Sequence, residues 1–271
     1  MPKIVATMQF AAGAFGPTAS VRNFKRFARP CRRAKTAMPR SVHRFLLTLA
    51  ALAMLAGCSS LPPVESPVAP PRFAVGDHWE YRIVDNMRRG AVSQLDAEVV
   101  ALADGVATLR FVLVDGGARS QWTDELDATG GLRAGMLNGP PVRRFTPAAA
   151  LLAFPLAQGK TWRQTVPTVR ADTQLRDEIL LYGNVQGRAG VAVPAGRFDA
   201  VQIYRVLQLD DGQPWRTRTT RRDQVWYAPE VKGVVREARE ATYAEPGDSG
   251  ATQVYTERTV TELVSFRPGR A

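Results

Sequence analysis

Apolar and polar residues alternate along most of the chain from residue 73 onward, and this period of two constrains the fold more than any other feature. In residues 106–114 (VATLRFVLV), every second side chain from position 107 to position 113 is apolar. Residues 201–209 (VQIYRVLQL) are apolar at positions 201, 203, 207 and 209. Because successive side chains of a strand point to opposite faces, this pattern indicates β-strands with one buried face.

Short turn sequences separate the alternating segments. Asp-Gly and Gly-Gly pairs, as at residues 104–105 and 130–131, supply the positive φ angles that hairpin turns require. The sequence therefore predicts an all-β antiparallel meander that forms a curved sheet or an open, incomplete barrel, with one short helix at 147–154 that begins with proline. The predicted strands are 78–85, 91–102, 105–114, 118–127, 142–146, 160–166, 173–186, 188–193, 197–209, 214–227, 233–244 and 251–266.

Two segments of this β domain, which we place at residues 72–267, share the short sequence pattern G-x-x-W. It is found at 76–79 and at 159–162, each time at the start of a predicted strand. We interpret it as the entry into two half-domains, residues 73–146 and 155–267, that share one core. Chance explains so short a repeat nearly as well.

Charge is distributed unevenly along the chain. The sequence has 36 lysine and arginine residues and 25 acidic residues, a net charge of +11. Residues 1–57 contain ten of the basic residues and no acid, which leaves 26 basic and 25 acidic residues in the remainder. The β domain is thus almost neutral, and it lacks the excess of positive charge that a nucleic-acid partner requires.

The N-terminal region has the order of a secretory signal: a basic segment at 38–44, an apolar run of ten residues at 45–54, and then Leu-Ala-Gly-Cys. The apolar run is too short to span a bilayer, which takes about 20 residues. The tetrad ending at Cys58 resembles the lipobox of bacterial lipoproteins. This resemblance implies a signal peptide at 38–57, cleavage before Cys58, and acyl chains on Cys58 as a membrane anchor. Residues 1–37 then form an upstream extension that is untranslated or unstructured.

The residues around Cys58 suggest where the anchored protein lies. In the lipoproteins it resembles, an aspartate after the cysteine retains the protein in the inner membrane, whereas this chain has Ser59 and Ser60. We therefore expect the periplasmic side of the outer membrane, with exposure on the cell surface as the alternative. Residues 58–71 contain five prolines and predict a stiff, extended tether.

No residue pattern in the β domain predicts an active site. The chain has two cysteines: Cys31 lies in the extension, and lipidation would consume Cys58, so the domain has no thiol. His78 is its single histidine and lies beside no nucleophile motif, so we expect no catalytic triad, no metal site and no cofactor. Asp124, Glu125 and Asp127 follow Trp122, and a carboxylate-dependent glycan hydrolase is a remote alternative. A solvated hairpin end explains these acids better.

Arginine and tryptophan residues are the remaining candidates for ligand contact. In an extended strand, Arg216, Arg218 and Arg222 share one face and could hold an anionic headgroup. The simpler interpretation is a solvated face paired with acids on the next strand, for example Glu237 or Glu240. A second set, of indole side chains, either fills the core or lines an apolar cup for a lipid. These are Trp79, Trp162 and Trp226.

Three phrases resemble a group of uncharacterised bacterial envelope proteins. They are FPLAQGKTW at 154–162, VPAGRFDA at 193–200 and WYAPEVKGVV at 226–235, and the likeness covers residues 73–266. It implies open β-barrels related in shape to lipoprotein carriers, without assigned catalytic residues. We therefore expect a non-enzymatic lipoprotein that binds a hydrophobic or amphiphilic ligand or an envelope protein. The alternative is a structural or assembly subunit without a ligand.

Overall fold

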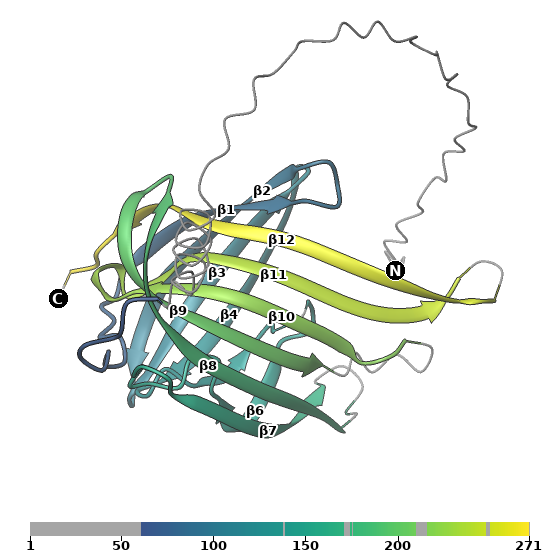
Figure 1. The fold of residues 1–271 in the computed structure, drawn as a ribbon, viewed down its shortest axis with the longest axis horizontal. Coiled ribbons are helices and arrows are strands. Elements are labelled where there is room, and N and C mark those ends of the chain that lie inside the picture. The colour runs from purple at the N-terminus through teal and green to yellow at the C-terminus, as the bar shows by residue number, and fades with distance from the viewer. Residues whose placement is uncertain are drawn as a thin grey trace, which may run out of the picture. The chain divides into compact units, whose positions relative to one another are not determined.

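The computed structural model describes residues 61–137, 139–170, 174, 176–209, 216–247 and 250–270. Within these residues the strands form one closed antiparallel barrel, in which each strand pairs with its neighbours in sequence and β1 pairs with β12 (Figure 1). The strands are β1 (His78–Asp85), β2 (Ala91–Ala103), β3 (Val106–Asp115), β4 (Ala118–Asp127), β5 (Leu132–Gly135), β6 (Arg143–Ala149), β7 (Thr161–Arg170), β8 (Arg176–Val193), β9 (Gly196–Leu209), β10 (Thr219–Ala228), β11 (Gly233–Pro246) and β12 (Thr252–Arg267). The predicted upstream extension, the signal peptide and Cys58 lie outside the described residues.

The prediction of an all-β antiparallel meander is confirmed, but the prediction of an open or incomplete barrel is wrong. β1 and β12 are paired from His78↔Arg267 to Asp85↔Thr259, with one irregularity, and this pairing closes the sheet. Hydrophobic periodicity reports which face of a strand is buried and carries no information on which strands pair. Closure therefore had no signal in the sequence.

Two strand predictions need correction as well. The segments at 173–186 and 188–193 belong to one strand, β8, whose pairing with β9 shifts between Val185 and Gly187. β5, at Leu132–Gly135, was not predicted, because four residues are too few to show a period of two.

The predicted helix at 147–154 is not formed. Residues 147–149 end β6, and the helix found among the described residues is the three-residue 3-10 helix η2 (Pro229–Val231). β6 pairs with β7 only through residues 143–145. Beyond them, the side chain of Gln164 on β7 makes the hydrogen bonds to the backbone of this segment. Its amide donates to the carbonyl of Ala148 at 2.9 Å and accepts from the backbone N–H of Ala150 at 2.9 Å. These bonds satisfy the backbone in an extended form and remove the need for helical hydrogen bonds.

The G-x-x-W segments at 76–79 and 159–162 form the same turn. At β1, the N–H of Gly76 donates to the carbonyl of Val99 at 2.8 Å, and the N–H of Val99 donates to the carbonyl of Asp77 at 2.9 Å. At β7, the N–H of Gly159 donates to the carbonyl of Val185 at 3.1 Å, and the N–H of Val185 donates to the carbonyl of Lys160 at 2.9 Å. Both glycines have positive φ, which only glycine adopts readily. The division into half-domains itself stays a prediction.

Residues 61–77 pack against the end of the barrel at which odd-numbered strands begin and even-numbered strands end, here called the Trp79 end. Val64 and Val68 are buried there, and Val68 exchanges backbone hydrogen bonds of 2.9 and 2.8 Å with Leu156. The carbonyl of Pro62 accepts a hydrogen bond from Arg188 N–H at 2.8 Å. Most of the segment assigned to the tether is therefore held on the barrel. No helix in the described part of the chain is long and apolar enough to cross a membrane.

Candidate functional site

A cavity of about 250 Å³ lies inside the barrel toward the Trp79 end. Most of its wall is apolar, contributed by aromatic and leucine side chains from opposite sides of the barrel. Charged residues and tyrosine hydroxyls complete the wall. The lining residues include Trp79, Tyr81, Ala97, Phe111, Asp124, Leu126, Leu152, Phe154, Arg205, Tyr227, Lys232 and Glu237.

One side of the cavity meets a network of five charged residues, here called the interior charge cluster: Arg205, Arg221, Asp223, Glu237 and Arg239. They lie on the adjacent strands β9, β10 and β11, where Asp223 stands opposite Arg205 on one side and Arg239 on the other. Arg205 donates to Asp223 at 2.7 Å and to Glu237 at 2.6 Å. Arg221 donates to Asp223 at 2.8 Å, and Arg239 donates to Glu237 at 2.6 Å. The cluster holds three guanidinium groups and two carboxylates.

Because the interior charge cluster is buried, the stability of the barrel should be sensitive to the loss of any one of its charges. The side chain of Asp223 is 0% exposed and that of Arg221 is 2% exposed. Burial alone raises the pKa of Asp223, but the charges of Arg221 and Arg205 outweigh it, and the pKa is held far below its usual range. Burial lowers the pKa of Arg221 to about 10, so its guanidinium stays charged at neutral pH. Its second anchor is the carbonyl of Leu137, 2.7 Å away.

The acids of β4 do not form a carboxylate pair. Asp124 lines the cavity, where burial raises its pKa to about 6, and it accepts a hydrogen bond of 3.1 Å from Met136 N–H. Glu125 lies on the opposite face of the strand, 3.7 Å from Arg144. Asp127 accepts hydrogen bonds from the backbone N–H groups of Thr129 and Gly131, and so stabilises the turn after β4. Asp124 and Glu125 are therefore not placed as the acid and base of a glycosidase.

The arginines singled out from the sequence lie away from the cavity. β10 begins at Thr219, so Arg216 and Arg218 precede the strand, and Arg222 is exposed. Arg216 donates to Glu245 at 3.1 Å and lies 3.9 Å from the centre of the Tyr243 ring. A shared role of Arg216, Arg218 and Arg222 in ligand contact stays a prediction.

The tryptophans have different surroundings. Trp79 lines the cavity, packs against Phe266 at a ring distance of 5.4 Å, and donates its N–H to the carbonyl of Val231 at 2.7 Å. Trp162 lies over Gly183, where a Cβ atom would come within 2.0 Å of the indole. Trp226 lies 5.2 Å below the guanidinium of Arg236. Of the three, Trp79 alone is among the cavity-lining residues.

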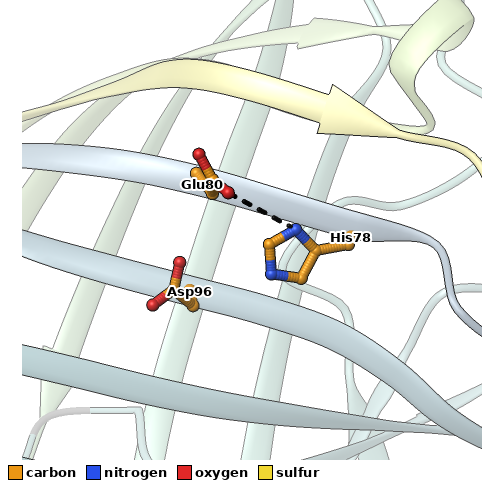
Figure 2. A group of neighbouring side chains, drawn as sticks. All are labelled: His78, Glu80 and Asp96. Carbon is orange, nitrogen blue, oxygen red and sulfur yellow. Dashed lines mark ion pairs between the residues drawn. The ribbon is translucent and has the colours of Figure 1, made fainter.

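His78, Glu80 and Asp96 form a second group, on the outer face of β1 and β2, and their side chains point toward one another (Figure 2). One nitrogen or oxygen of each lies within 4.8 Å of the others, a spacing at which they could hold a metal ion. No metal site was expected from the sequence, but hairpin pairing places Asp96 directly opposite Glu80. Arg267 already brings a positive charge to this group, 3.1 Å from His78 Nδ1 and 3.8 Å from Glu80.

Sequence reasoning missed the interior charge cluster, although a signal for it was present. Residues 219, 221, 223, 225 and 227 alternate with 220, 222, 224 and 226, and the first set ends in the apolar pair Val225 and Tyr227. Both are buried, so Arg221 and Asp223 point into the barrel with them. Arg222, the residue of this strand that was considered for ligand contact, lies on the other face and is exposed.

Comparison with known proteins identifies no family. No protein-family model matches this sequence, and no curated protein matches it. Among solved structures, a candidate lipoprotein from Parabacteroides distasonis is 13% identical with a TM-score of 0.45, covering 75% of this chain and 100% of its own. A candidate exported protein with a YmcC-like fold from Bacteroides fragilis is 13% identical with a TM-score of 0.42, covering 74% and 99%. The hypothetical lipoprotein YmcC from Escherichia coli is 9% identical with a TM-score of 0.34, covering 87% and 100%. These likenesses are too distant to assign a function to this chain.

Proposed function

We propose that this protein is a lipid-anchored envelope protein whose barrel binds a single-chain amphiphile without catalysing a reaction on it. The observation that carries the proposal is the apolar cavity of about 250 Å³ inside a closed barrel. Ligand pockets are usually about 300–1,000 Å³, so this one suits one acyl chain better than a two-chain phospholipid. Phe111, Leu126 and Phe154 supply the apolar wall for the chain.

The anchor proposed at Cys58 would hold the barrel close to the membrane. Pro62 already contacts the barrel, and Gly187 leaves room for Leu61, because a Cβ atom on it would lie 2.7 Å from Leu61 Cβ. Three residues span at most about 11 Å when extended. The Trp79 end of the barrel therefore faces the bilayer, on the periplasmic side of the outer membrane. Ser59 and Ser60 favour that membrane.

Quenching of tryptophan fluorescence tests the proposal. The probe is a monoacylglycerol that carries bromine on its acyl chain, because bromine quenches an indole that it touches. We expect saturable quenching of the purified full-length protein. The variant Trp79→Phe should show a smaller quenched fraction because it lacks the indole at the cavity. The matched variant Trp226→Phe should keep the quenched signal, since its indole lies outside the cavity wall.

The same titration separates the proposal from its alternative, a structural or assembly subunit with no small-molecule ligand. A protein that serves only as such a subunit would show no saturable quenching. Quenching that is lost in Trp226→Phe and kept in Trp79→Phe would place the brominated acyl chain outside the barrel. That result would overturn the assignment of the cavity as the binding site.

A further inference from the structure

Strand geometry brings the side chains of His78, Glu80 and Asp96 together on the outer face of the barrel. His78 and Glu80 are two residues apart on β1, so their side chains leave the sheet on the same side. Asp96 stands directly opposite Glu80 on β2, where facing side chains lie close together. β1 is paired with β2 on one side and with β12 on the other, so the backbone that carries these groups is held in place. The three side chains therefore converge without the ordering of a loop (Figure 2).

The donor atoms of this group suit a transition-metal ion. His78 offers an imidazole nitrogen, and Nδ1 of its ring lies 4.0 Å from Oε1 of Glu80. Imidazole binds zinc and related ions, whereas Mg²⁺ and Ca²⁺ prefer sites built of oxygen atoms. Ligand atoms on a tetrahedral zinc ion lie about 3.4 Å apart, and the side chain of Glu80, which is 42% exposed, can rotate to close the gap. Three protein ligands leave the fourth position for water.

The two carboxylates of the group repel each other. Like charges that stand directly opposite on neighbouring strands destabilise a sheet, and Glu80 and Asp96 stand in that relation. Arg267 offsets part of this repulsion, since it lies 3.8 Å from Glu80. The carboxylate of Asp96 has no ion pair or hydrogen bond with any residue in the described part of the chain. One of the two negative charges is therefore left without a counterion.

The other arginines near this group do not supply that counterion. Arg82, the next outward residue of β1, pairs with Glu262 at 2.6 Å. Arg110 of β3 pairs with Glu98 of β2. Arg270 lies near the group but is exposed and makes no ion pair with a described residue. The group therefore holds two carboxylates against one guanidinium, and a divalent cation between the carboxylates would remove their repulsion.

We infer that His78, Glu80 and Asp96 bind one Zn²⁺ ion on the outside of the barrel, with water as its fourth ligand. Arg267 leaves the group when the ion binds, because its side chain is 70% exposed and an exposed ion pair costs little to break. The ion joins β1 to β2 beside the pairing of β1 with β12 that closes the barrel. None of the three ligands lines the cavity, so the inference does not depend on the proposed function.

Titration of Zn²⁺ into the full-length protein, first freed of metal with a chelator and then followed by calorimetry, tests the inference. Asp96→Asn removes one charge and keeps the shape of the side chain. It should weaken zinc binding at this site at least about tenfold, since even a residue that only supports a metal ligand changes the affinity by about 10–100-fold. Zinc bound elsewhere in the chain is the same in each variant, so the difference between variants reports this site. The matched control is Glu240→Gln, on the outer face of β11, which should bind zinc like the wild-type protein. Equal binding by the wild-type protein and Asp96→Asn would overturn the inference.

Arg267→Gln gives a second test that does not depend on the folding of the first variant. It removes the competing positive charge, so zinc should bind several-fold more tightly. Bound zinc should also raise the unfolding temperature of the wild-type protein, because the site exists only in the folded barrel, and it should not raise that of Asp96→Asn. Unchanged zinc affinity in Arg267→Gln would contradict the displacement of this arginine. A preference for Ca²⁺ over Zn²⁺ in the same titration would overturn the assignment of the metal.

Discussion

Asp223→Ala is expected to lower the free energy of unfolding by about 3–5 kcal/mol, the usual cost of removing one partner from a buried ion pair. Asp223 is the central acceptor for Arg221 and Arg205, at 2.8 and 2.7 Å. Without it, Glu237 alone would face the three guanidinium groups of the cluster, and Arg221 would keep only its bond to a backbone carbonyl. Because domains are stable by only about 5–15 kcal/mol, a large part of the stability should be lost. Urea unfolding followed by circular dichroism measures the change.

The matched control is Glu240→Ala, which removes an acid from an ion pair on the outside of the barrel. Glu240 and Arg258 are 2.8 Å apart, but their side chains are 37% and 57% exposed. Exposed pairs contribute about 0–1 kcal/mol, so this variant should unfold at nearly the wild-type urea concentration. Equal, small losses in both variants would show that the interior charge cluster does not stabilise the barrel.

Cys58→Ser is expected to abolish acylation of the protein completely. A thioether to the lipid can form only at a thiol, and the chain offers two, at Cys31 and Cys58. Cells that express each variant are grown with an alkyne analogue of palmitate, and the protein is isolated and examined for the label. The wild-type protein and Cys31→Ser should both be labelled, and Cys58→Ser should not.

This experiment also tests the start of the mature protein. Cleavage before Cys58 removes Cys31 with the upstream extension, so the intact mass of the labelled protein should correspond to residues 58–271 plus acyl groups. A label that persists in Cys58→Ser, or a mature protein that retains Cys31, would contradict the lipoprotein assignment and the location proposed from it.

Local sequence signals predicted most of the strands and their antiparallel meander, but not the closure of the barrel. β1 and β4 begin and end where the alternation and the turn residues placed them, at His78–Asp85 and Ala118–Asp127. Closure depends on the pairing of β1 with β12, which are separated by most of the domain, and no local pattern reports such a contact. The missing helix at 147–154 has the same origin, because the extended form there depends on Gln164 of the next strand.

The candidate site was predicted only in part. Trp79 was singled out as a possible ligand contact, and it lines the cavity. Arg221 and Asp223 were not singled out from the sequence, although their alternation with the buried Val225 and Tyr227 identifies them as inward residues. Arg205 is the one charged residue among the inward residues 201, 203, 205, 207 and 209 of β9, and its pairing with Asp223 of β10 explains why it is there.

The central claim, that the interior of the barrel is the binding site, is tested most directly by filling it. Ala97 is 3% exposed and lines the cavity, so Ala97→Phe adds a phenyl group where the acyl chain would lie. Ala238→Phe makes the same change on β11, on the face away from the cavity. In the titration with the brominated monoacylglycerol, Ala97→Phe should lose saturable quenching while Ala238→Phe binds like the wild-type protein. Wild-type binding by a folded Ala97→Phe variant would contradict the claim.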